Sequence, residues 1–252
     1  MENPSLFMMI WPWIGLGAAI VLLIILFATD WLRSSKGESR WKDPTWFAWL
    51  AAVAYMLHNV EEYGIDAMGA SLGFPEMMAT SMQVAPPESF FLTVNLGLVW
   101  IAGPLAALFS RKYPVLALAM PTVELVNCFL HIPGAIAMQF IGAGLMTAVF
   151  LFVPIAIWAF VGLCGKGRLK RTWYLAFVGI AVVYHIGFVA TIVPLILGVA
   201  PGFLPALTMA AFTVLMLLLW YLMAKRSKKA RQAFSKEASA STAYRCRTKE
   251  EG

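Results

Sequence analysis

Charged residues are scarce in this sequence of 252 residues: they make up 13% of it, about half the share of an ordinary soluble domain. Hydrophobic residues make up 61%, and the mean hydropathy is +0.77. These proportions exclude a soluble globular enzyme and a disordered chain. They also exclude a nucleic-acid-binding protein, because the net charge of +6 comes from short segments between apolar runs and from the C-terminal part.

Several residue patterns that define common active sites are missing. No lysine lies in an apolar run, which excludes a Schiff base of the kind that holds retinal. No glycine-rich phosphate loop and no serine in a nucleophile turn is present. The three cysteines are Cys128, in an apolar run, and Cys164 and Cys246, both in basic segments, so no pair is placed for a structural disulfide.

Seven apolar runs are present instead, and each is long enough for a helix that crosses a bilayer, which takes ~17–25 residues and more when the helix is tilted. The first run is longer than the core of a signal peptide, so we expect it to be retained. The runs cover about 6–29, 45–61, 89–109, 113–134, 141–162, 173–198 and 203–224. The sequence therefore predicts an all-α, polytopic membrane domain of seven transmembrane helices over residues 1–224.

Basic residues alternate along the chain as expected for seven spans. All 19 follow the first, third, fifth and seventh runs, while the N-terminal segment and the segments after the other runs hold none. Because basic flanks mark the cytoplasmic side of a membrane protein, we expect the N-terminus outside and the C-terminus in the cytoplasm.

Two segments lie outside the runs. Residues 63–89 lack lysine and arginine but are rich in methionine, glycine and proline, and they form either a lid over the outer surface or an interfacial connector. Residues 225–252 are basic and rich in serine and alanine. They are predicted to be a disordered cytoplasmic tail whose first third lies on anionic headgroups.

Ionisable residues inside the apolar runs are the strongest functional signal, because such groups are costly in lipid. All three histidines of the chain, His58, His131 and His185, lie in runs. Glu61 and Glu62 follow His58 by three and four residues, which is one helical turn, so the three side chains share a helix face.

A second polar stripe lies in the fourth run, where Glu124, Asn127 and His131 are spaced three and four residues apart. A rise of ~1.5 Å per residue places both stripes at a similar depth, between the bilayer midplane and its outer half. The predicted catalytic residues are His58, Glu61, Glu62, Glu124, Asn127 and His131. The predicted pocket residues are Tyr55, Asn95, Trp100, Phe129 and His185.

The string from 58 to 62 resembles the signature of the HXXEE family of bacterial membrane proteins. Asn127 and His131, four residues apart, match its second signature. The third signature, Tyr-x-Pro-Gly, falls at 141–144, where only the glycine matches. The resemblance covers about residues 45–165 and implies a multi-pass protein of the bacterial inner membrane. It implies a site and no reaction, because the family has no assigned function.

Three functions fit these residues. In the first, Glu61, Glu62 or Glu124 acts as a general acid on a lipid or isoprenoid substrate while a histidine accepts a proton, since hydrocarbon surroundings favour a protonated carboxyl group. This chemistry is that of an isomerase or cyclase. Sterol isomerases of the emopamil-binding type are similar in using intramembrane histidine and glutamate.

In the second, His58, Glu62, Glu124 and His131 bind zinc or non-haem iron, which would make the chain a metal-dependent intramembrane hydrolase or oxygenase. In the third, the same groups form the relay of a small proton-coupled transporter. Spacing alone does not separate these functions, because each needs the same residues on the same helix faces.

Overall fold

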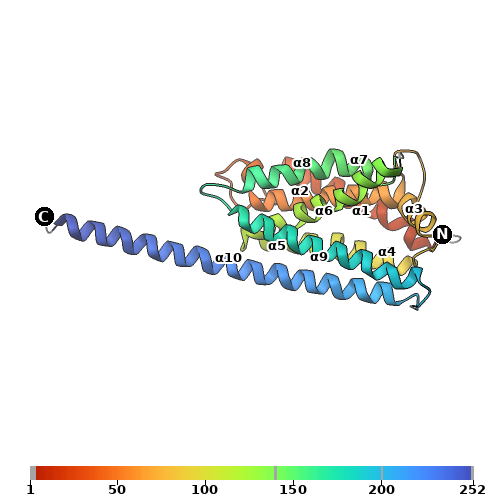
Figure 1. Ribbon diagram of the computed structural model, residues 1–252. Coiled ribbons are helices and arrows are strands. Elements are labelled where there is room, and N and C mark those ends of the chain that lie inside the picture. The colour runs from red at the N-terminus through yellow and green to blue at the C-terminus, as the bar shows by residue number, and fades with distance from the viewer. Residues whose placement is uncertain (1–3, 139–140, 200, 251–252) are drawn as a thin grey trace.

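A computed structural model of the chain describes residues 4–138, 141–199 and 201–250 (Figure 1). In these residues every regular element is a helix, apart from one isolated bridge between Cys164 and Leu169. The predicted all-α fold is therefore confirmed.

The described chain forms seven lengths of helix, each of which overlaps one of the seven apolar runs, and the last extends well beyond its run. Some lengths combine α-helix with 3₁₀ or π turns. In order they are α1 (Leu6–Ala28); α2 (Pro44–Asn59) with η2 (Val60–Gly64); α4 (Glu88–Asn95), η3 (Leu96–Ala102) and α5 (Gly103–Ser110); η4 (Pro114–Leu118) with α6 (Ala119–Met138); α7 (Leu145–Thr147), η5 (Ala148–Phe152), α8 (Val153–Trp158) and η6 (Ala159–Leu163); α9 (Arg171–Ile196); and α10 (Leu204–Glu250). Two short helices, η1 (Arg40–Lys42) and α3 (Gly73–Met82), lie in the connections.

Six of these lengths, as far as the chain is described, are long and apolar enough to cross a membrane: Leu6–Ala28, Glu88–Ser110, Pro114–Ile136, Leu145–Leu163, Arg171–Ile196 and Leu204–Ala230. The chain is therefore a multi-pass membrane protein. The length formed by α2 and η2 is less apolar, because its polar string 58–62 lowers its hydropathy. It nevertheless packs against α1 and α5 inside the bundle (Figure 1).

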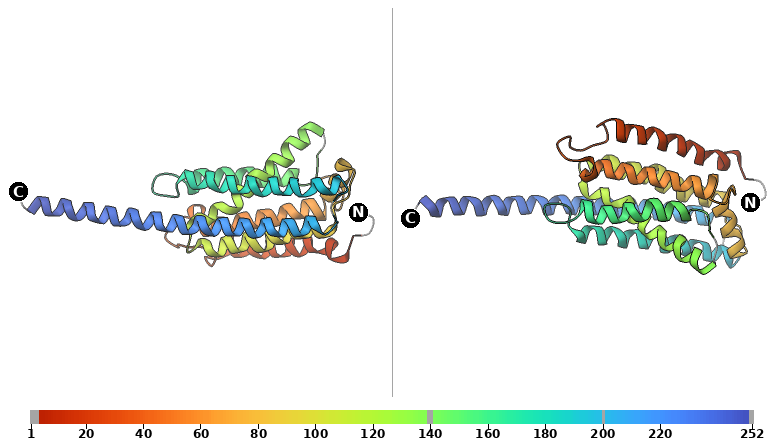
Figure 2. Two further views of the ribbon diagram at one scale, coloured as in Figure 1. Left: turned by 60° about the horizontal axis from the view of Figure 1, so that its bottom comes forward. Right: turned by 90° about the horizontal axis from the view of Figure 1, so that it is seen from above.

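The two ends of the bundle differ in charge. The described N-terminal end of the chain lies at one end, and α10 leaves the bundle at the other (Figures 1 and 2). Because successive helices alternate in direction, the basic segments after α1, α5 and η6 lie at the end where α10 leaves. This clustering is the pattern that the positive-inside rule associates with a cytoplasmic face.

The start of α2 is fixed by a buried carboxylate. Oδ1 of Asp43 accepts hydrogen bonds from the backbone N–H groups of Thr45 (2.9 Å) and Trp46 (3.0 Å) in the first turn. Its Oδ2 accepts from the N–H groups of Ser34 and Ser35, both at 2.8 Å. An aspartate at this position satisfies N–H groups that a helix leaves free, and here it also ties the preceding loop to α2.

The segments outside the runs take definite positions. Helix α3, in the segment 63–89, lies at the end of the bundle away from the α10 extension and packs on η2 (Figure 1). Helix α10 continues past the bundle to Glu250. The disorder expected for residues 225–252 stays a prediction, and the described backbone of this tail is helical.

Candidate functional site

Three buried side chains from two helix lengths meet in the bundle: His58 from α2, Glu62 from η2 and His131 from α6. Nε2 of His58 and Nε2 of His131 each lie 3.3 Å from the same oxygen, Oε1 of Glu62. The two imidazole rings are perpendicular, at 86°, with centroids 4.9 Å apart. All three side chains are buried. The two stripes that the sequence predicted therefore converge, and this group is called the His–Glu–His cluster below.

The last turn of the second helix length is a π turn, in which the N–H of Ile65 donates to the carbonyl of Val60, five residues back, at 2.8 Å. Single π turns are frequent at functional sites. Both Glu61 and Glu62 of this turn are buried. They point to different partners, since Glu62 contacts the histidines and Glu61 contacts the start of α7.

Glu61 joins this turn to the fifth helix length. Its Oε1 accepts a hydrogen bond from the backbone N–H of Met146 at 2.9 Å. Its Oε2 accepts from the N–H of Thr147 at 2.7 Å and from the Thr147 hydroxyl at 2.5 Å. A carboxylate at the N-terminal end of a helix satisfies N–H groups that the helix leaves free. Glu61 is thus a positioning group, and the structure places it beside the His–Glu–His cluster.

The contacts of the Thr147 hydroxyl indicate which nitrogen of a neutral His58 carries the proton. The two acceptors of this hydroxyl are Oε2 of Glu61, at 2.5 Å, and the more distant Gly144 carbonyl, at 3.3 Å. With its single hydrogen directed to the nearer Glu61, its oxygen accepts from Nδ1 of His58, 2.7 Å away. The hydrogen of a neutral His58 is then on Nδ1, and Nε2 presents a lone pair to Glu62. This Nε2 is buried and has no partner with hydrogen-bond geometry. Two acceptor atoms that face each other at 3.3 Å repel each other unless a cation or a proton lies between them.

Gly144 lies directly against both histidines. Its φ is +86°, a conformation that favours glycine. A Cβ added there would lie 2.6 Å from Cε1 of His131 and 2.7 Å from Cε1 of His58, so no larger residue fits. This is the one residue of the Tyr-x-Pro-Gly signature that the sequence keeps, and its contacts with the histidines give the physical reason.

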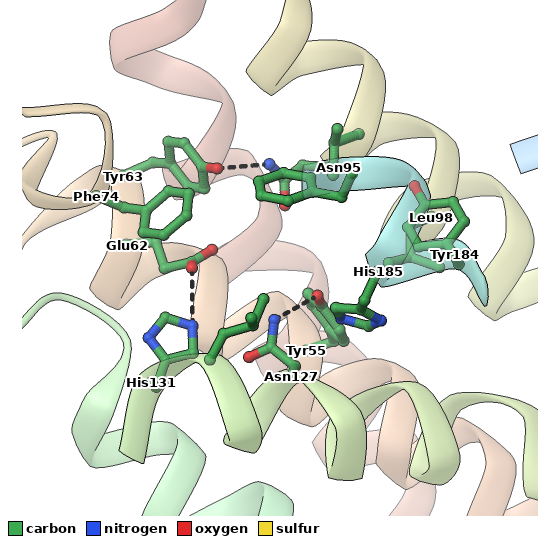
Figure 3. A pocket seen from close by; sticks show the side chains of 13 residues that line it. Tyr55, Glu62, Tyr63, Phe74, Asn95, Leu98, Asn127, His131, Tyr184 and His185 are labelled. Atoms are coloured by element: carbon green, nitrogen blue, oxygen red, sulfur yellow. Dashed lines mark hydrogen bonds and ion pairs between the residues drawn. The ribbon is translucent and has the colours of Figure 1, made fainter. Parts of the chain in front are cut away.

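A small cavity of about 30 Å³ adjoins Glu62 and His131 (Figure 3). It has room for about one or two water molecules. We call it the polar cavity, since Tyr55, Asn95 and Asn127, all predicted site residues, lie in its wall.

Hydrogen bonds hold these polar residues in place. Nδ2 of Asn95 donates to the hydroxyl of Tyr63 at 2.8 Å, and Nδ2 of Asn127 donates to the hydroxyl of Tyr55 at 3.3 Å (Figure 3). Oδ1 of Asn127 is buried and has no partner among the described residues. His185 also lines the polar cavity, but its Nδ1 lies 2.8 Å from the carbonyl oxygen of Ala181 in its own helix.

Three predicted site residues lie elsewhere. Glu124 is fully buried, and it is not part of the His–Glu–His cluster. Phe129 is 67% exposed, because it lies two residues, or about 200° around α6, from the inward-facing Asn127. Trp100 packs edge-on against Trp11, with ring centroids 6.4 Å apart. Neither aromatic residue lines the polar cavity.

Gly144 and Thr147 are the site residues that sequence reasoning missed. The only signal for Gly144 is its place in the family's third signature. Thr147 has no signal, because a threonine in an apolar run is common and its partners lie 86 and 89 residues away in the sequence.

Comparison with known proteins supports the resemblance seen in the sequence. A family model described as "Protein of unknown function with HXXEE motif" matches residues 49–159. This stretch contains the whole His–Glu–His cluster together with Gly144 and Thr147. Among curated proteins and among solved structures, none matches the chain.

Proposed function

We propose that this chain, whose residues 49–159 belong to the HXXEE family of unknown function, is a membrane-embedded metalloenzyme. Its His58, Glu62 and His131 bind one divalent ion, for which zinc is the best fit. Two imidazoles and one carboxylate are a ligand set of catalytic zinc sites, which keep the fourth position open for water or substrate.

The distances in the cluster carry this proposal. Nitrogen and oxygen ligands lie ~2.0–2.1 Å from zinc, and the edge of a tetrahedron with such bonds is about 3.3–3.4 Å. The two observed Nε2 to Oε1 distances are both 3.3 Å. Direct N–H···O hydrogen bonds are usually shorter, about 2.9–3.0 Å. Two of the three separations between ligand atoms therefore have the spacing of ligands around one ion, and all three atoms lie within 4.8 Å of one another.

The position of the proton on His58 also supports a bound metal ion. The hydrogen of His58 is held on Nδ1 by Thr147, which leaves the Nε2 lone pair free for a metal. Metal-binding histidines usually donate their other N–H to an outer group in this way. The Glu61–Thr147–His58 chain has the same role as the carboxylate–histidine–metal arrangements of known zinc sites.

The polar cavity supplies the reaction space. A zinc ion with an open position lowers the pKa of bound water to about 7 and so makes it a nucleophile at neutral pH. The free Oδ1 of Asn127 can accept a hydrogen bond from that water or from a substrate hydroxyl. We therefore propose a hydrolytic reaction on a substrate dissolved in the membrane.

The proposal includes the predicted topology. With α2 and η2 counted as a span, the chain crosses the inner membrane of a bacterium seven times, with the N-terminus outside and the C-terminus in the cytoplasm. The His–Glu–His cluster then lies in the outer half of the bilayer, and α3 covers it from the outer surface.

A second candidate, acid–base catalysis without a metal, is favoured by one observation: a single oxygen of Glu62 is shared by two imidazoles. A protonated Glu62 could then give its proton to the substrate while one of the two histidines takes a proton from the substrate, as an isomerase or cyclase of a lipid or isoprenoid requires. The two candidates differ in whether purified protein contains metal.

The test is metal content by mass spectrometry after purification in mild detergent without chelator. We expect about one zinc per chain, lost in the variant His58→Ala/His131→Ala. His185→Ala is the matched control, since it removes a buried histidine outside the cluster, and it should keep the zinc. Each variant must elute as a single species in size-exclusion chromatography. No metal in the unmodified protein, even after incubation with zinc, would overturn the proposal and leave acid–base catalysis.

A further inference from the structure

A second and larger cavity, of about 120 Å³, also borders His131. Its walls come from α3 (Phe74 and Met77), from α6 (Leu130 and Gly134) and from the residues before and at the start of α7. Among the described residues, all that line it except His131 are apolar or glycine. We call it the apolar cavity. An apolar cavity offers no hydrogen-bond partners to water and binds apolar ligands instead.

The apolar cavity and the polar cavity share three wall residues: Phe74, Leu130 and His131. His131 therefore borders both cavities. A ligand that extends from one cavity to the other would have its polar end at Glu62 and His131 and its apolar part against α3. This is the arrangement expected for an amphiphile.

The position of Leu130 indicates where such a ligand enters. Leu130 lines both cavities and is 41% exposed on the outer face of α6. Nearby on the same helix, Phe129 is 67% and Ile136 is 73% exposed. In a membrane-spanning helix such apolar side chains face lipid, so the cavities adjoin the bilayer core rather than water.

Small residues keep the apolar cavity open. A Cβ added at Gly134 would meet no atom within 4 Å, so this glycine faces empty space. A Cβ at Gly142 would lie 3.0 Å from Sδ of Met77, so this glycine lets α3 approach closely. The space is thus bounded by the backbone and by flexible methionine, which adapts to the shape of a bound chain.

We infer that the apolar cavity binds the hydrocarbon chain of a single-chain lipid, either acyl or prenyl, whose polar end lies at His131. The inference gives the substrate class of the proposed function, namely a single-chain lipid. Only the reaction at the polar end of this lipid rests on the proposed function. Binding of the chain depends on the shape and apolar lining of the cavity, which the metal does not alter.

The test uses two photoactivatable probes, a fatty acid and a prenyl alcohol, each with a diazirine near the end of its chain. The protein is placed in bilayers of phosphatidylethanolamine and phosphatidylglycerol, illuminated, and digested for peptide mass spectrometry. We expect one of the probes to label the peptides that carry residues 130–136 or 142–145. The probe that labels these peptides more strongly shows whether the chain is acyl or prenyl.

The matched pair of variants is Gly134→Leu and Gly179→Leu. Both put the same side chain into open space on a helix, but Gly179 lies on α9 and lines neither cavity. Gly134→Leu should lower labelling about tenfold, the effect of displacing roughly two buried methylene groups. Gly179→Leu should leave it unchanged. Labelling that is equal in the two variants, or that falls on other peptides, would overturn the inference.

Zinc content is measured in the same samples, which separates the two proposals. Selective labelling without zinc would contradict the metalloenzyme and leave the lipid-binding cavity standing. Zinc without selective labelling would contradict the lipid-binding cavity and leave the metal site standing.

Discussion

The hydroxyl oxygen of Thr147 lies 2.7 Å from Nδ1 of His58, on the side of the imidazole ring away from Glu62. The same hydroxyl donates its hydrogen to Glu61. These contacts orient the ring and favour a proton on its Nδ1. The HXXEE string thus contains two carboxylates with separate tasks, because Glu62 contacts the histidines directly and Glu61 acts through Thr147.

Replacing Thr147 by valine removes this hydroxyl and keeps the shape of the side chain. We expect zinc affinity to fall about 10–100-fold, the usual effect of removing an outer hydrogen bond to a metal-binding histidine. Competition with a fluorescent chelator measures the affinity. Thr191→Val is the control, since the Thr191 hydroxyl donates to the Gly187 carbonyl of its own helix. Equal affinities in the two variants would show that Thr147 does not orient His58.

Replacing Gly144 by alanine should destroy the metal site, because the new Cβ would overlap the rings of His58 and His131. A positive φ also costs about 1–3 kcal/mol for a residue other than glycine. Gly198→Ala separates the two effects, since Gly198 has a φ of +66° but open space around it. We expect both variants to unfold at lower temperature, and only Gly144→Ala to lose zinc. Normal zinc binding by Gly144→Ala would show that Gly144 does not pack closely against the two histidines.

Replacing Glu124 by methionine should stabilise the protein. Both carboxyl oxygens of Glu124 are buried and have no partner in the described chain, and a buried polar group without a partner is costly. We expect a gain of about 0.5–2 kcal/mol, seen as a higher unfolding temperature in detergent. Glu61→Met should have the opposite effect, because it removes the acceptor of three hydrogen bonds, two of them from backbone N–H groups. A lower unfolding temperature for Glu124→Met would reveal a bound partner of Glu124.

The thiol of Cys164 should react slowly with alkylating reagents. Cys164 follows the last residue of η6, and burial raises the pKa of its thiol to about 11. At pH 8 only about a thousandth of it is then the reactive thiolate. In a Cys246→Ser background, peptide mass spectrometry should find little modified Cys164 before unfolding in detergent and complete modification after it. Rapid modification of the folded protein would show that the segment after η6 is open to solvent.

The sequence predicted the helix lengths and the convergence of two polar stripes, because both depend on local periodicity. His58 and Glu62 share a helix turn, and His131 reaches them since its own stripe is at the same depth. The sequence does not predict the roles of Gly144 and Thr147, because these depend on a loop conformation and on contacts between distant parts of the chain. Trp100 and Phe129 are expected at the pocket only because they are aromatic. The side of the helix on which each one lies directs its side chain away from the polar cavity.

The exposure of Leu130 beside both cavities has a consequence for measuring activity. A site that opens sideways into lipid meets its substrate at a two-dimensional concentration, the mole fraction in the bilayer. Adding inert lipid or detergent at constant total substrate would then slow the reaction, while adding more buffer would not. For such an enzyme, a KM stated as molarity in the assay volume would describe the preparation rather than the protein.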